Sequence, residues 1–153
     1  TRVLPRAFVV SDVRVAPDRV AALDAVRADG FDPAKSVVLE KAISGQPSAV
    51  SGQPSAVKIV GYGPNEIWLD VDAPSAGVLV LSEVYYPGWR AWVNDREVEV
   101  LRANYLFRAV EVSPGAQRVR LLYDPWSFKI GVGLCAITIL VLIGWFVWRV
   151  RKK

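Results

Sequence analysis

The sequence of 153 residues contains no histidine, no methionine and a single cysteine, Cys135. One cysteine cannot form a disulfide within the chain, and without histidine no His/Cys metal site and no Ser-His or Cys-His nucleophile pair can be built. These absences exclude most catalytic schemes, and we expect no cofactor and no metal site. Cys135 lies in an apolar stretch, where a free thiol serves as a small packing residue.

Charge is missing from a long stretch near the C-terminus, Ile130 to Trp148, which reads IGVGLCAITILVLIGWFVW. At about 1.5 Å per helical residue, this length is enough to cross a hydrocarbon core of roughly 30 Å. A buried core helix would show a polar position in each turn, and none occurs here. Trp126 precedes the stretch and Trp145 lies near its far end, and such rings favour membrane interfaces. The sequence therefore predicts a transmembrane helix over 126–149.

Basic residues close the chain at the far end of this helix, in the order Arg149, Arg151, Lys152 and Lys153. Positive residues next to a span favour the cytoplasmic side, so the tail at 150–153 is expected in the cytoplasm and residues 1–125 outside the cytoplasmic membrane. The other 15 basic residues balance the 15 acidic ones, so the outer domain is formally neutral. This balance argues against nucleic acid as a partner.

The first ten residues, TRVLPRAFVV, are too polar and too few to act as a signal segment. A domain outside the membrane must nevertheless be carried across it. We therefore expect the chain to be the C-terminal piece of a longer multi-pass protein, whose upstream transmembrane helices and lipid bilayer are its partners. A mature product of signal cleavage is the alternative.

Hydrophobic periodicity predicts one short helix in the segment APDRVAALDAVRADG, with Pro17 at its first position and Gly30 as its stop. Short strands separated by turn residues fill most of the remaining domain. The predicted strands lie within 4–15 and at 36–40, 57–61, 66–72, 78–86, 89–93, 97–112 and 118–123. The predicted fold is mainly β, an antiparallel β-sandwich (jelly-roll-like) with one short N-terminal helix, followed by the transmembrane helix.

A tandem duplication interrupts this pattern, because SGQPSAV occurs at 44–50 and again at 51–57. Seven residues with Gly and Pro are too few for a solenoid repeat, which needs about twenty or more to bury a face. We interpret 43–57 as a lengthened surface loop.

Alternation along the strands assigns faces to the aromatic and basic residues. In WRAWV, Trp89 shares the core-facing side with Ala91 and Val93, and Trp92 points outward. In the strand 97–112, Arg102, Asn104 and Arg108 lie opposite the apolar positions, and Val110 and Val112 break the alternation. A bulge near 108–110 is therefore expected.

If these strands are neighbours in one sheet, their outward residues form a ligand-binding face together with Arg118 and Arg120. Guanidinium groups match phosphate, and an indole can stack on a sugar ring. The candidate ligand-binding residues are Arg90, Trp92, Arg102, Asn104, Arg108 and Tyr85; no catalytic residue is predicted. The alternative is a solvated sheet face with cross-strand ion pairs, because Glu97, Glu99 and Glu111 lie on or beside the same strands.

Three acidic residues on one strand, Glu66, Asp70 and Asp72, form a row of carboxylates. Such a row is compatible with paired catalytic acids or a calcium site. A solvated strand face explains it more simply, and we prefer that interpretation.

The segment from Pro64 to Phe128, with the helix after it, resembles the C-terminal end of the bacterial YfhO family of polytopic membrane proteins. The motifs YYPGW at 85–89, RANYLFRAV at 102–110 and YDPWSF at 123–128 carry most of this resemblance, and LPRAFVV at 4–10 also fits. The turn at Asn94, Asp95 and Arg96 departs from the more usual Asp-Gly.

The resemblance implies a multi-spanning parent similar to glycosyltransferases that use polyprenyl-phosphate-linked sugars and act on cell-envelope polymers. The catalytic carboxylate of such enzymes is expected in an early outer loop, upstream of this chain. The domain would then be a non-catalytic accessory part that helps to bind the lipid-linked sugar or the acceptor glycan. The alternatives are a structural or protein-docking module and, less favoured, a freestanding hydrolase.

Overall fold

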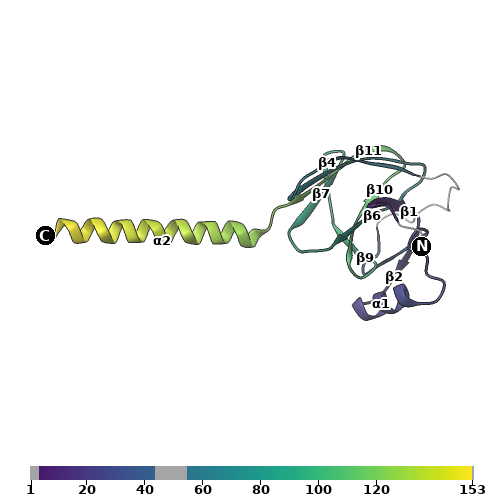
Figure 1. Cartoon of the computed structure of the whole chain (residues 1–153), viewed down its shortest axis with the longest axis horizontal. Coiled ribbons are helices and arrows are strands. Elements are labelled where there is room, and N and C mark those ends of the chain that lie inside the picture. The colour runs from purple at the N-terminus through teal and green to yellow at the C-terminus, as the bar shows by residue number, and fades with distance from the viewer. Residues whose placement is uncertain (1–3, 44–54, 153) are drawn as a thin grey trace. The chain divides into compact units, whose positions relative to one another are not determined.

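The computed structural model describes residues 4–43 and 55–152, and it divides the chain into two units, Thr1–Tyr123 and Asp124–Lys153 (Figure 1). Within these described residues, the first unit contains two β-sheets and one short helix, and the second contains one long helix. This content confirms the predicted fold class, a mainly β sandwich followed by an apolar helix.

Sheet A has six strands in the order β1-β6-β10-β9-β3-β2. Their bounds are β1 Ala7–Val10, β2 Asp12–Val15, β3 Ser36–Leu39, β6 Gly77–Val84, β9 Leu101–Ala103 and β10 Phe107–Val112. Neighbouring strands are antiparallel except β2 and β3, which pair in parallel.

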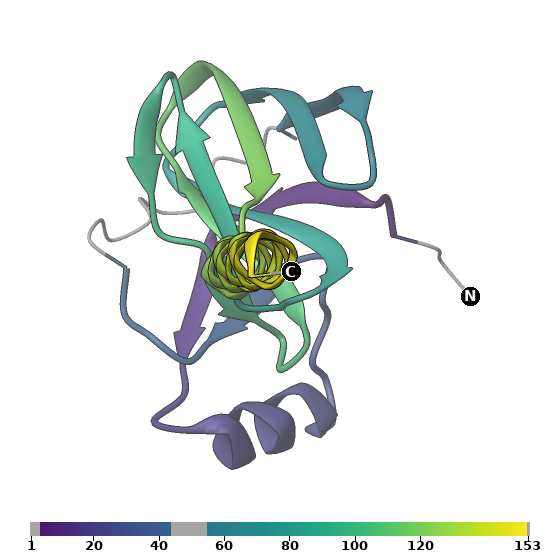
Figure 2. The same ribbon diagram turned by 90° about the vertical axis from the view of Figure 1, so that its left-hand side faces the viewer.

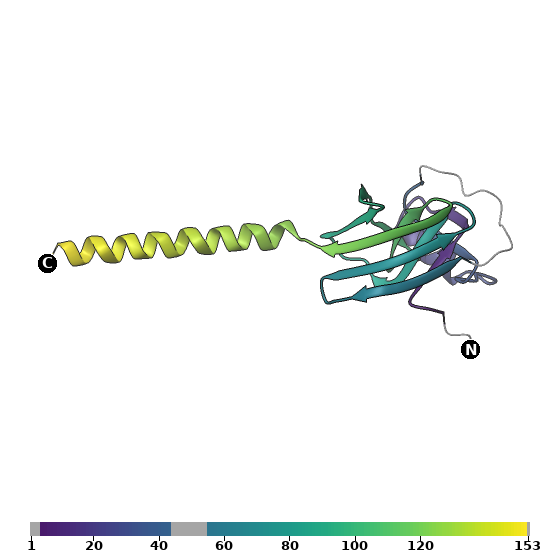
Figure 3. The same ribbon diagram turned by 90° about the horizontal axis from the view of Figure 1, so that it is seen from above.

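Sheet B has five strands in the order β4-β5-β11-β7-β8, all antiparallel. Their bounds are β4 Ala56–Tyr62, β5 Glu66–Ala73, β7 Trp89–Val93, β8 Arg96–Val98 and β11 Gly115–Tyr123. Figure 3 shows β11 beside the β4–β5 hairpin, with the end of β11 and the hairpin turn at the same end of the sheet. The predicted loop at 43–57 includes Ala56 and Val57, which instead belong to β4. Residues 44–54 of that loop lie outside the described part of the chain.

The main core lies between the two sheets. Its large buried side chains are the inward positions that alternation predicted on β5 and β11, together with matching positions on β6 and β10: Ile67, Leu69, Val71, Leu79, Leu81, Val110, Val119 and Leu121. Burial of each such side chain contributes roughly 1.5–3 kcal/mol. Trp89 and Val93 pack against this core as predicted.

Helix α1, Arg19–Arg27, covers part of sheet A near β3 and lies on the side of the domain away from sheet B in Figure 2. The side chain of Asp18 accepts a hydrogen bond from the Ala21 amide at 2.8 Å and caps the helix. Pro17 therefore precedes the cap instead of occupying the first helical position. Ala22 is fully buried against Val38 of β3.

The predicted continuous strand over 97–112 is wrong. The chain forms β8, β9 and β10, and β9 and β10 are joined by a hairpin whose turn residues Asn104 and Tyr105 have positive φ angles of 48° and 70°. Asn94 and Asp95 make a similar turn between β7 and β8, with φ angles of 48° and 66°. Two successive residues in the left-handed backbone conformation match the right-handed twist of the paired strands.

A register shift between Phe107 and Arg108 lies at the edge of the region where a bulge was predicted. Helix α2, Trp126–Arg151, forms the second unit, and it is the one helix in the described residues that is long and apolar enough to cross a membrane. Its length of 26 residues agrees with the predicted span at 126–149.

Candidate functional site

The outer face of sheet B carries a row of stacked aromatic and basic side chains. Arg120 of β11 is paired in register with Trp68 of β5 on one side and Trp92 of β7 on the other. Its guanidinium carbon lies 5.1 Å from the Trp68 ring centroid and 5.4 Å from that of Trp92. All three side chains are half-buried. Guanidinium and indole faces attract each other at these distances.

Arg90 extends this row, because it lies two residues before Trp92 on β7 and therefore on the same face of the sheet. Its guanidinium carbon lies 5.1 Å from the Trp92 centroid, and its Nε and Nη2 atoms each donate a 2.8 Å hydrogen bond to the Glu97 carboxylate. These hydrogen bonds lower the pKa of Glu97 below its usual range, because they stabilise the charged carboxylate. We call Trp68, Arg120, Trp92 and Arg90 the tryptophan–arginine row.

The predicted carboxylate row on β5 lies beside the tryptophan–arginine row. Glu66 accepts a 2.7 Å hydrogen bond from Arg120, and Asp70 accepts one of 3.0 Å from Arg118. The bond to Asp70 also raises the pKa of Arg118. Both carboxylates are thus members of cross-strand ion pairs, and in residues 4–43 and 55–152 no group of three or more acidic, histidine or cysteine side chains could hold a metal ion.

The remaining predicted ligand residues do not join this row. Arg102 and Arg108 lie in sheet A, whereas Arg90, Arg118 and Arg120 lie in sheet B, so the arginines do not share one sheet face. Arg102 stacks over the Tyr85 ring at 4.7 Å and makes an ion pair with Glu40 at 3.4 Å.

Asn104 is 7% exposed and acts as a structural bridge in the β9–β10 turn. Its side-chain oxygen accepts a 2.8 Å hydrogen bond from the Val38 amide, and its own amide donates one of 2.8 Å to the Val38 carbonyl. The expectation that Asn104 faces outward is therefore wrong.

Arg108 was also expected to face outward, but it is 3% exposed and points between the sheets. The hairpin and the register shift before it place Arg108 on the same side as the buried Val110. Its guanidinium carbon lies 3.8 Å from the Trp89 ring centroid, and one of its nitrogens, Nη2, donates a hydrogen bond to Glu83. The other two nitrogens have no hydrogen-bond partner in the described structure. Burial lowers the pKa of Arg108, and the charge of Glu83 opposes this effect.

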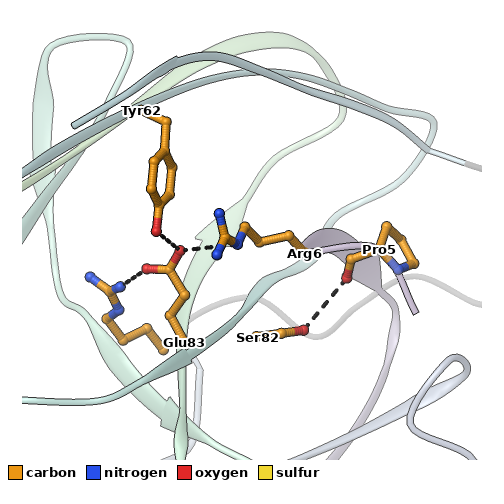
Figure 4. Close-up of polar contacts among 6 residues, drawn as sticks. Pro5, Arg6, Tyr62, Ser82 and Glu83 are labelled. Atoms are coloured by element: carbon orange, nitrogen blue, oxygen red, sulfur yellow. Dashed lines mark hydrogen bonds and ion pairs between the residues drawn. The ribbon is translucent and has the colours of Figure 1, made fainter. Parts of the chain in front are cut away.

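Glu83 is the centre of this polar cluster, which joins the two sheets at one end of the sandwich (Figure 4). Besides the bond from Arg108, its carboxylate accepts a 2.8 Å hydrogen bond from the Tyr62 hydroxyl and lies 3.6 Å from Nε of Arg6. The hydrogen bond to Glu83 raises the pKa of Tyr62, because it stabilises the protonated phenol. Glu83 was not identified from the sequence. The signal was available, because Glu83 follows the inward Leu79 and Leu81 at a spacing of two, which directs its carboxylate toward the core.

Together these features define a β-sandwich domain with an aromatic and basic outer face, continuous in sequence with a helix fit to span a bilayer. This is the architecture of a membrane-anchored β-sandwich domain. Residues 47–135, more than half of the chain, match the family model described as bacterial membrane protein YfhO, and the chain belongs to that family. It is therefore a membrane protein, and α2 is a candidate transmembrane helix. Neither a curated protein nor a solved structure matches the chain.

Proposed function

We propose that the β-sandwich is an extracytoplasmic accessory domain of a glycosyltransferase-like, multi-pass protein of the bacterial cell envelope. In this proposal it helps to bind a lipid-linked sugar or the acceptor glycan through the outer face of sheet B. The observation that carries the proposal is the tryptophan–arginine row, in which Arg120 is held between Trp68 and Trp92.

The chemistry of the row suits a phosphorylated or glycosylated ligand. The C–H groups of a pyranose ring pack on indole, and guanidinium groups donate to phosphate oxygens and sugar hydroxyls. The flanking carboxylates of Glu66 and Glu97 accept hydrogen bonds from hydroxyls. Stacking and ion pairing hold the arginine side chains in place, which reduces the conformational entropy lost when a ligand binds.

The same ion pairs favour binding over catalysis. A general acid needs a pKa near the working pH, and the hydrogen bonds from Arg90 keep the pKa of Glu97 below its ordinary value. We propose that this chain has no catalytic residue and that the reaction belongs to upstream loops of the parent. The basic residues at the end of α2, Arg149 and Arg151, support a cytoplasmic C-terminus and hence an outer position for the domain.

A titration tests this proposal. The complete chain in lipid nanodiscs is titrated with a polyprenyl-phosphate-linked sugar and, separately, with soluble envelope glycan fragments. Trp92→Ala should lower the affinity about tenfold, which corresponds to about 1.4 kcal/mol. Arg102→Gln is the matched control, because Arg102 also stacks on a ring and pairs with a glutamate, but lies in sheet A. A folded Trp92→Ala variant with unchanged affinity for both ligands would refute the proposal.

A second candidate is a structural or protein-docking module that braces the parent. It is favoured by the pairing of Arg120 with Glu66 and of Arg90 with Glu97, which is how an exposed sheet face is commonly kept soluble. Under this candidate, Trp92→Ala leaves glycan affinity unchanged but lowers the amount of complete parent protein found in membranes.

A further inference from the structure

Exposed apolar side chains of the β-sandwich gather at one end. Among the described residues before Asp124, the large hydrophobic side chains that are exposed are Val15, Val20, Val60, Tyr62, Val84, Tyr86 and Leu106. Four of them lie in turns or at strand ends at one end of the sandwich: Tyr62, Val84, Tyr86 and Leu106. Their exposed fractions are 53%, 63%, 61% and 47%, respectively. We call these four residues the apolar rim.

Hydrogen bonds and ring contacts show that the elements bearing the apolar rim meet. The Tyr85 amide donates a 2.6 Å hydrogen bond to the Leu106 carbonyl, which joins the β6–β7 connection to the β9–β10 turn. The Tyr123 amide donates one of 2.8 Å to the Asn65 carbonyl, which joins the end of β11 to the β4–β5 turn. The rings of Tyr86 and Tyr123 lie 6.3 Å apart.

The chain continues toward its membrane segment from this same end. Tyr123 is the last residue of β11, and only Asp124 and Pro125 separate it from Trp126, where α2 begins. Three residue steps span at most about 11 Å even when fully extended. A headgroup layer is roughly 5–8 Å thick on each side of the hydrocarbon core. With Trp126 at the interface, the end of β11 is therefore within reach of the lipid headgroups.

From these observations we propose that the apolar rim rests on the lipid bilayer and docks the β-sandwich against the membrane surface. Exposed tyrosine rings such as those of Tyr62 and Tyr86 suit the headgroup level, where an amphipathic ring contacts both apolar and polar parts of the lipid. Arg6, whose side chain is 57% exposed and stacks over the Tyr62 ring at 4.6 Å, adds a cation that attracts lipid phosphates. This inference does not depend on glycan binding by sheet B.

Site-directed spin labelling of the complete chain tests the docking. In a Cys135→Ser background, single cysteines are introduced by Tyr86→Cys, Leu106→Cys and, as the control, Ala116→Cys. Ala116 is exposed and lies near the start of β11, at the opposite end of that strand from Tyr123. The labelled proteins are reconstituted in phosphatidylcholine–phosphatidylglycerol vesicles, and collision rates with oxygen and with a water-soluble nickel chelate are measured.

Labels at Tyr86 and Leu106 should show an oxygen-to-nickel accessibility ratio several-fold higher than the label at Ala116. Equal ratios at all three positions overturn the proposal. Vesicles with tenfold less protein distinguish lipid from a second copy of the chain: shielding that disappears on dilution indicates self-association and also overturns it. If the Tyr86→Cys protein does not fold, Val84→Cys reports on the same rim.

Discussion

The ion pair between Glu83 and Arg108 gives the sharpest test of how the two sheets are held together. Glu83→Gln keeps an oxygen that can accept hydrogen bonds but removes the negative charge. The Arg108 side chain is 4% exposed and has no other ion-pair partner among the described residues, so the variant leaves a buried cation uncompensated. Removing one partner of a buried pair costs about 3–5 kcal/mol, and the retained acceptor places the expected cost near 3 kcal/mol.

The converse change should cost less. In Arg108→Met, the Glu83 carboxylate, which is 14% exposed, still faces Arg6 and the Tyr62 hydroxyl, so about 1.5 kcal/mol is expected. The double variant Glu83→Leu with Arg108→Met removes both charges and keeps most of the volume. It should lie within about 1 kcal/mol of the wild type, because replacing a buried pair with apolar residues avoids the desolvation of two ions.

Pulse proteolysis in urea measures these differences, since it detects the unfolded fraction of the β-sandwich while α2 remains in a detergent micelle. With a slope of about 1.5 kcal/mol per molar urea, Glu83→Gln should lower the unfolding midpoint by about 2 M. Glu97→Gln is the control, because its ion pair with Arg90 is exposed and the midpoint should not move. If Glu83→Gln shifts the midpoint no more than this control, or if the double variant loses as much stability as Glu83→Gln alone, the buried pair does not join the sheets as argued.

Three other predictions follow from particular contacts. The hydrogen bond to Glu83 raises the pKa of Tyr62 above 10.0, so the stability it contributes is complete below pH 10 and is lost as pH rises through the higher folded-state pKa. The ultraviolet difference titration between wild type and Tyr62→Phe should show this late ionisation, and Glu83→Gln should return it toward the ordinary value. Gly77→Ala should destabilise the β-sandwich by roughly 1–3 kcal/mol, because the added carbon would lie 2.9 Å from the Val10 carbonyl oxygen. Gly63→Ala is the control and should be tolerated, because its added carbon would lie 3.5 Å from the nearest atom. Urea unfolding midpoints of the two variants measure the difference. Protease added to intact spheroplasts should digest the β-sandwich, and protection until lysis would contradict an outer location.

Much of the fold could be predicted because one face of each sheet is buried. The alternation of Ile67 and Leu69 with Trp68 fixed which side chains enter the core, and the structure confirms it. The row of Arg120 between two tryptophans is also an outcome of period-two alternation. Alternation gives no information on which strands become neighbours. The prediction grouped Arg102 with Arg120 only on the condition that their strands share one sheet, and the structure places them in different sheets.

The main error arose at a turn without glycine. Asn104 and Tyr105 adopt positive φ angles in a stretch whose apolar alternation continues on both sides, so nothing in the local pattern marked the hairpin. Asn tolerates this conformation well, but a tyrosine rarely adopts it. Because the hairpin was missed, the outward faces assigned to Asn104 and Arg108 were wrong, and Arg108 was placed in solvent instead of beside Trp89.

The two-residue connection between β11 and α2 has a consequence for the affinity that the proposed binding of a lipid-linked ligand would require. A short tether confines the sandwich to a thin layer of solution beside the lipid, and a ligand anchored in the same lipid is confined with it. Encounters within such a layer occur at effective concentrations in the millimolar range. For the lipid-linked ligand proposed above, a contact too weak to detect between freely diffusing partners would then be sufficient for occupancy, and rapid release would leave the domain ready for the next ligand.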